Sequence, residues 1–210
     1  MTSTPLEIAR LSKALDSLPP YVFAELDRLK ADARQRGVTF DDLGIGSPDR
    51  PTASSIIEAL QRAAADPATH GYPPFRGVPT YLESVARFMK HRFGVQTDAV
   101  TEVLALAGAK EGIAQLITAT AGSGDVVLVP EIYYPVYARA SLLAGAEVHF
   151  IPMRASTGFL ADFDAVPSSV LRHARILIVN YPNNPTGAVA EREYFERAVA
   201  FAHQHGLILI

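Results

Sequence analysis

Apolar residues are distributed differently in the two halves of the chain. In the second half, strands are predicted at short apolar runs, at residues 103–107, 125–130, 147–152, 176–179 and 207–210. Helices are predicted where apolar residues recur at helical spacing between these runs, at residues 113–121, 134–144, 163–173 and 191–205. Because strands and helices alternate, the sequence predicts an α/β fold with a mostly parallel sheet flanked by helices.

The first half predicts amphipathic helices instead, at residues 21–37, 54–65 and 81–93. Gly37 and Gly94 are placed to end the first and the last of these helices. Two prolines, Pro19 and Pro20, interrupt the segment before the first helix. We interpret this leading segment as an arm that crosses to another subunit or bridges two domains.

The run at residues 176–179 is apolar at every position, as expected of a strand that is buried on both faces. It leads into Asn-Tyr-Pro-Asn-Asn-Pro-Thr-Gly at residues 180–187. Open α/β sheets bind ligands at the carboxyl ends of their strands, and an Asn amide both donates and accepts hydrogen bonds. The segment is therefore a candidate binding site, and the alternative is a plain turn before a helix.

Two more segments follow predicted strands. Gly-Ala-Lys-Glu-Gly at residues 108–112 precedes a helix, whose first free N–H groups suit a phosphate; a tight turn is the simpler alternative. Tyr133, Tyr134 and Tyr137 follow the strand at 125–130. A tyrosine ring there can stack on a planar ligand, although tyrosines more often serve as packing residues.

Two loops of the first half also carry candidate residues. In the loop at residues 42–51, Gly46 has no side chain, so its backbone can approach a ligand closely. The loop at residues 70–79 places Tyr72, Phe75 and Arg76 among glycines and prolines. A loop with aromatic and cationic residues, like the one at 70–79, usually contacts a ligand or another subunit. The alternative for this loop is a plain surface loop, and the alternative for the loop at 42–51 is an ordinary turn.

Composition narrows the classes of function. The chain has 210 residues, 49% of them hydrophobic, and a net charge of −3 without a dense basic block, so nucleic-acid binding has no support. The absence of cysteine excludes disulfides and thiolate metal sites, and the six histidines are not spaced as metal ligands. No apolar run approaches the roughly 20 residues that span a membrane, and no signal core is present. We therefore expect a soluble, cytoplasmic protein.

In their order and spacing, these segments resemble the class I and II aminotransferases, which are fold type I enzymes that depend on pyridoxal 5'-phosphate. The resemblance covers nearly the whole chain and is greatest to the branch with the LL-diaminopimelate, alanine and aspartate aminotransferases. Its most specific segments lie at residues 43–49, 71–77, 108–112, 134–135 and 180–187.

The resemblance implies roles for individual residues. The backbone of Ala109 and Lys110 would hold the cofactor phosphate, and Tyr134 would stack on the pyridine ring. Asn184 would donate to the phenolic oxygen of the ring and help to hold the substrate carboxylate. Each role agrees with the chemistry expected of its segment.

The resemblance also implies how the chain is divided and assembled. Residues 1–45 would form an N-terminal arm and small-domain segment, and residues 46–210 the first part of the large cofactor-binding domain. Gly46 would present its backbone to the substrate carboxylate. Tyr72 would reach across a homodimer interface to the cofactor phosphate of the partner.

The implied activity is transfer of an amino group between an amino acid and a 2-oxo acid. The chain stops at Ile210, before the segments that would carry the Schiff-base lysine, the aspartate at the ring nitrogen and the carboxylate-binding arginine, so we expect it to be an N-terminal part that does not transaminate alone. The substrate is undetermined. Alternatives are a lyase or decarboxylase of the same fold, and a noncatalytic aminotransferase-like sensing module.

Overall fold

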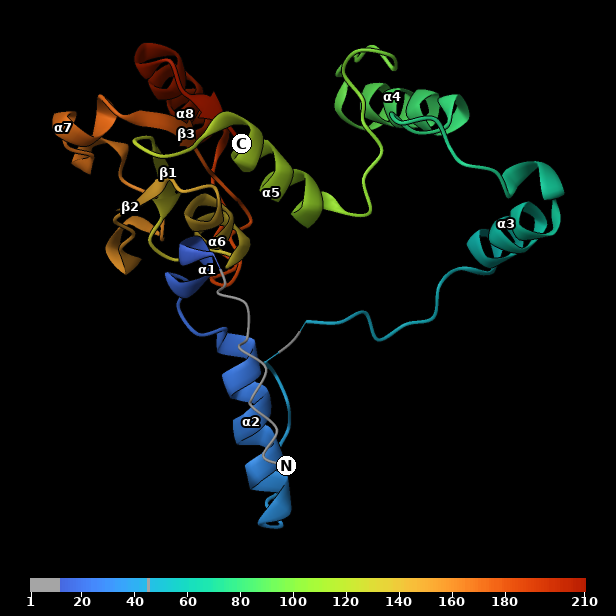
Figure 1. Ribbon diagram of the computed structural model, residues 1–210, viewed down its shortest axis with the longest axis horizontal. Coiled ribbons are helices and arrows are strands. Elements are labelled where there is room, and N and C mark those ends of the chain that lie inside the picture. Colours follow the sequence, from blue (N-terminus) through green and yellow to red (C-terminus); the bar gives the residue numbers. More distant parts are fainter. Residues whose placement is uncertain (1–11, 45) are drawn as a thin grey trace, which may run out of the picture. The chain divides into compact units, whose positions relative to one another are not determined.

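The computed structural model describes residues 12–44 and 46–210, and Figure 1 shows its helices and strands. These residues form two compact units. One contains residues 12–20 and Leu106–Ile210, and the other contains Tyr21–Ala105. The expected division at residues 45 and 46 stays a prediction, and residues 1–11 and 45 of the expected arm lie outside the described residues.

The first unit is built on a parallel sheet with the strand order β2-β1-β3-β4. Its strands are β1 (Val126–Pro130), β2 (Glu147–Ile151), β3 (Ala174–Leu177) and β4 (Ile208–Leu209). Its α-helices are α1 (Lys13–Asp16), α5 (Ala109–Thr120), α6 (Val136–Leu143), α7 (Ser168–Leu171) and α8 (Arg192–His205), and its 3-10 helices are η2 (Ala155–Thr157) and η3 (Phe163–Ala165). The predicted α/β fold with a parallel sheet is confirmed.

The sheet is covered on both faces, as the side chains of β1 show. Val127 and Val129 belong to one core cluster with Ile117 of α5 and residues of α6. Leu128 points to the opposite face and belongs to a second cluster with Tyr194 of α8. Because successive side chains of a strand point to opposite faces, a strand between two helical layers must be apolar at every position. The continuous apolar runs in the sequence have this origin.

One predicted strand is wrong. Residues 103–107 all belong to the described part of the chain and form no strand. Leu104 is exposed, and the N–H group of Ala105 donates to the carbonyl of Arg76, which lies in a loop. An apolar run becomes a strand only when a neighbouring strand satisfies its backbone groups, and no strand of the described sheet pairs with this segment.

The second unit contains helices and loops. Its helices are α2 (Val22–Gln35), α3 (Ser54–Ala65), the 3-10 helix η1 (Pro67–Thr69) and α4 (Pro79–Phe93). The three helices predicted for this half are confirmed, and α4 ends at Gly94 in the left-handed conformation, as expected. Among the described residues of both units, no helix combines the length and the apolar character needed to cross a membrane.

Candidate functional site

The strand order creates a switch point between β1 and β3. From β1 the chain crosses through α6 to β2 on one side, and from β3 it crosses through α8 to β4 on the other side. In open parallel sheets, the crevice for a ligand lies outside the carboxyl ends of the strands where the connections diverge in this way. The loops that follow β1 and β3 are therefore the place to look for a site.

The turn after β3 is held by its own backbone. Asn183 donates its N–H group to the carbonyl of Ala188 at 2.8 Å, and Gly187 donates to the carbonyl of Asn183 at 2.8 Å. The N–H group of Asn184 donates to Oδ1 of Asn180 at 3.3 Å. The side chain of Asn184 is exposed and has no hydrogen-bond partner among the described residues. The turn thus presents a free amide at the carboxyl end of a fixed strand.

The start of α5 offers backbone donors. The N–H groups of Ala109 and Lys110 lie in the first helical turn and have no acceptor in the described part of the chain. The Glu111 carboxylate is engaged elsewhere, because it accepts from the N–H group of Ala107 at 2.8 Å and from Nε2 of Gln115 at 3.0 Å. Free N–H groups and the positive end of the helix dipole together suit a phosphate.

The structure brings the start of α5 and the loop after β1 together. The ammonium group of Lys110 lies 5.9 Å from the centre of the Tyr134 ring. The neighbouring tyrosines serve packing: Tyr133 stacks on Phe150 with ring centres 5.2 Å apart, and Tyr137 is buried. Burial raises the pKa of Tyr137, and nearby Tyr134 adds to the increase. Tyr134 itself is only partly buried, so its ring can meet a ligand.

The groups described so far fit one kind of ligand. Ala109 and Lys110 supply donors for an anionic phosphate, Tyr134 supplies a flat ring, and Asn184 supplies an amide. All four belong to the first unit and lie at strand ends or at a helix start on its sheet. This set matches a phosphate that is carried on a planar, polar aromatic ring.

A residue without a predicted role links two of these segments. Nδ2 of Asn183 donates to the carbonyl of Ile132 at 3.2 Å, so the turn after β3 is tied to the loop after β1. The sequence offers little to find it, because its neighbour Asn184 is the same residue type and the contact spans distant parts of the chain.

The remaining predicted site residues, Gly46 and Tyr72, belong to the second unit and are exposed. Gly46 lies in the loop between α2 and α3, and Tyr72 lies in the loop before α4. Their contacts with a substrate and with a partner subunit stay predictions.

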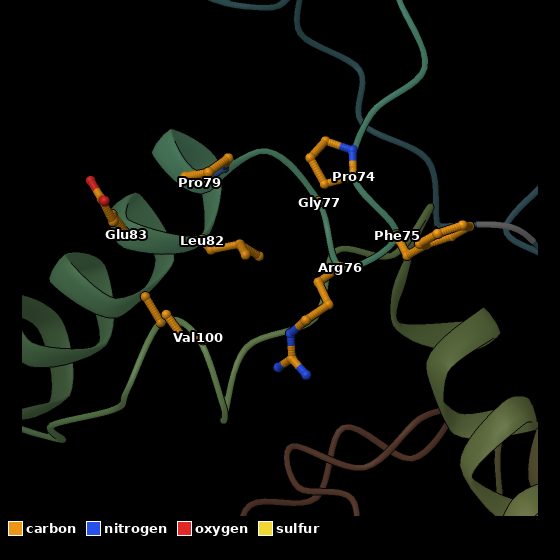
Figure 2. A pocket seen from close by; sticks show the side chains of 9 residues that line it. Pro74, Phe75, Arg76, Gly77, Pro79, Leu82, Glu83 and Val100 are labelled. Atoms are coloured by element: carbon orange, nitrogen blue, oxygen red, sulfur yellow. The ribbon is translucent and has the colours of Figure 1, made fainter.

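The loop that carries Tyr72 continues along a largely apolar pocket of the second unit, with a volume of about 380 Å³ (Figure 2). Figure 2 shows Phe75 and Leu82 at this pocket. The guanidinium group of Arg76 donates to the carbonyl of Val103 at 3.1 Å. Arg76, the cationic residue that the sequence identified in this loop, therefore anchors the loop within its own unit.

Comparison with known proteins gives a consistent result. The family model described as aminotransferase class I and II matches residues 40–210. The LL-diaminopimelate aminotransferase of Syntrophobacter fumaroxidans is 48% identical to this chain over 198 residues, which cover 94% of this chain and 51% of that relative. The chain spans about half the length of the curated relatives that it matches.

Solved structures agree with the sequence relatives. The apo structure of BacF from Bacillus subtilis matches with a TM-score of 0.88 at 37% identity, over 95% of this chain and 51% of that one. A probable N-succinyldiaminopimelate aminotransferase from Thermus thermophilus matches with a TM-score of 0.83 at 45% identity, over 90% of this chain and 51% of that one.

Proposed function

Because this chain belongs to the class I and II aminotransferases, we propose that the complete protein transfers an amino group between an amino acid and a 2-oxo acid. The cofactor of this family is pyridoxal phosphate. The observation that carries the proposal is the pair of free N–H groups of Ala109 and Lys110 at the start of α5, together with the Lys110 ammonium group 5.9 Å from the centre of the Tyr134 ring. A phosphate and an aromatic ring joined in one molecule satisfy both features.

The chain's own residues would bind and orient the cofactor. When bound, pyridoxal phosphate supplies an electron sink for the carbanion at the substrate Cα. Ala109 and Lys110 would donate their N–H groups to the phosphate, where the dipole of α5 favours negative charge. Tyr134 would hold the ring by stacking. Asn184 would donate to the phenolic oxygen of the ring and to the substrate carboxylate, which its exposed, free amide allows.

The second unit would contribute contacts to the substrate and to the partner subunit. Gly46 would offer its backbone to the substrate carboxylate, and Tyr72 would contact the cofactor phosphate of the partner in a homodimer. Full exposure of the Tyr72 and Phe75 side chains on one loop supports an interface there, because large exposed aromatic residues are enriched at interfaces. Absence of cysteine fits a reducing compartment, so the cytoplasm is the proposed location.

The substrate class follows from the names of the relatives. Relatives of 46–48% identity are LL-diaminopimelate aminotransferases, and a solved structure at 45% identity is described as a probable N-succinyldiaminopimelate aminotransferase. We therefore propose a long amino acid with a second polar end, and LL-diaminopimelate is the first to test. These relatives give no support to a lyase, a decarboxylase or a sensing module.

The test measures amino transfer and cofactor binding separately. The complete protein is incubated with pyridoxal phosphate, 2-oxoglutarate and single amino acids: LL-diaminopimelate, N-succinyl-LL-diaminopimelate, aspartate and alanine. We expect glutamate to form with one of the diaminopimelate substrates, and dialysis to leave the cofactor bound. A protein that retains no pyridoxal phosphate and forms no glutamate with any amino acid would refute the proposal. The variant Asn184→Ala is tested beside the unmodified protein, and we expect it to form less glutamate and to retain less cofactor after dialysis.

A further inference from the structure

Asn183 stands out among the polar residues of the described chain. Of these residues, only Ser141 and Asn183 are buried polar or charged side chains, and Asn183 is 5% exposed. The Ser141 hydroxyl donates to the carbonyl of Tyr137, one turn back in the same helix. Asn183 instead bonds to a segment that is far away in the sequence. The hydrogen bond of Asn183 therefore joins two distant segments, whereas that of Ser141 stays within one helix.

The two ends of the Asn183 amide serve different segments. Nδ2 donates to the carbonyl of Ile132 at 3.2 Å, in the loop after β1. Oδ1 accepts from the N–H group of Thr186 at 3.2 Å and from the Thr186 hydroxyl at 2.8 Å, within the turn after β3. A carbonyl can only accept and a backbone N–H can only donate, so these partners determine which way the amide faces.

The segments joined in this way carry two of the residues proposed to bind the cofactor. Asn184 directly follows Asn183, and Tyr134 follows Ile132 in the loop before α6. The bond crosses the switch point between β1 and β3, where backbone pairing has ended. The buried amide therefore joins the two loops directly. Binding groups that are held in place before a ligand arrives lose less entropy on binding.

We propose that Asn183 is a positioning residue that holds Asn184 and Tyr134 at the spacing that pyridoxal phosphate requires. It acts through these residues, because its own side chain is buried and its hydrogen bonds go to protein atoms. This inference rests on the proposed function, since it concerns binding of the same cofactor.

Asn183→Asp tests the role with little change in shape. The carboxylate can still accept from Thr186, but it places an oxygen against the carbonyl of Ile132 and removes the bond between the loops. We expect affinity for pyridoxal phosphate, measured by equilibrium dialysis, to fall about tenfold, as loss of one buried hydrogen bond implies. The circular dichroism of the bound cofactor should weaken as its orientation becomes less defined.

A double-mutant cycle with Asn184→Ala separates positioning from general destabilisation. Where Asn184 is already removed, Asn183→Asp should cost clearly less affinity than it does in the unmodified protein, because coupled residues are not additive. Ile178→Val is the stability control, because it removes one methyl group from the core just after β3 and leaves the turn's bonds in place. Asn183→Ser, which lacks Nδ2 and adds no charge, replaces Asn183→Asp if that variant does not fold.

The outcomes are distinct. A variant that lowers the unfolding midpoint but keeps the wild-type cofactor affinity and dichroism would show that Asn183 is merely structural, and would overturn the inference. Equal effects of Asn183→Asp with and without Asn184 would do the same. If the unmodified protein binds no pyridoxal phosphate, the proposed function itself is wrong, and this inference falls with it.

Discussion

The ammonium group of Lys110 lies 5.9 Å from the centre of the Tyr134 ring. One residue belongs to the first turn of α5 and the other to the loop after β1, so the contact marks where a helix start and a strand end converge. A cation over an aromatic face contributes little when exposed, about 0.5–1 kcal/mol. The contact shows that the Lys110 side chain reaches from the first turn of α5 to the ring of Tyr134 in the loop after β1.

Ala109→Pro should remove one phosphate donor without breaking α5. Ala109 is the first residue of the helix, where proline is well tolerated, and the preceding Gly108 has no Cβ that would clash with the proline ring. Because hydrogen bonds to charged groups contribute about 1.5–3 kcal/mol, affinity for pyridoxal phosphate should fall at least tenfold. Equilibrium dialysis measures the change.

Two controls test Ala109→Pro: a ligand without the phosphate and a second variant at the same position. Pyridoxal without its phosphate should bind equally well to the unmodified protein and to Ala109→Pro, and Ala109→Ser, which keeps the N–H group, should behave like the unmodified protein. Equal loss of affinity for pyridoxal and for pyridoxal phosphate would place the phosphate elsewhere.

Tyr134→Ala should weaken cofactor binding, whereas Tyr134→Phe should retain most of it. Stacking of aromatic rings contributes about 0.5–1.5 kcal/mol beyond burial, which corresponds to a loss of roughly two- to tenfold in affinity. Titration of the cofactor's absorbance measures both variants. If Phe and Ala weaken binding equally, the hydroxyl group matters and the ring does not stack.

Gly77→Ala should destabilise the second unit. Gly77 has a φ of +110°, and an added Cβ would lie 2.6 Å from the Cβ of Ala105. Both the backbone conformation and the close contact oppose a side chain, so we expect a loss on the order of 1–3 kcal/mol in the free energy of unfolding. Gly71→Ala in the same loop is the control, because its Cβ would meet nothing within 4 Å. Urea denaturation that finds the two variants equally stable would contradict this account.

Tyr194 should make the first unit sensitive to alkaline pH. Burial, with a hydrogen bond to Tyr181, raises the pKa of Tyr194 well above its usual range. The unfolded chain ionises this phenol near pH 10, whereas the folded protein keeps it protonated to higher pH. The contribution of Tyr194 to the free energy of unfolding is therefore complete below that pH and is lost as pH rises above it. Urea denaturation between pH 9 and 11 should show a shallower loss of stability for Tyr194→Phe than for the unmodified protein.

Tyr72→Phe is the matched control for the alkaline experiment. The Tyr72 side chain is fully exposed, so removing its hydroxyl group should leave the slope of stability against pH unchanged. The same slope in all three proteins would mean that Tyr194 ionises equally easily when folded and unfolded.

The sequence by itself determined most of the helices and most of the strands, and it supplied the residues that are proposed for the site. Hydrophobic periodicity and glycine stops act over a few residues, so Gly94 could be recognised as the end of α4 and residues 176–179 as a buried strand. The roles proposed for Ala109, Lys110 and Asn184 come from motifs that are equally local.

Tertiary structure alone decided what depends on contacts between distant segments. The apolar run at residues 103–107 forms no strand, because no strand of the described sheet pairs with it. The order β2-β1-β3-β4 makes neighbours of the loops after β1 and β3, and only then can the Asn183 amide reach the carbonyl of Ile132. Many strand orders and registers are compatible with the same set of strands. The side-chain pattern within a single strand therefore does not predict which strands will pair.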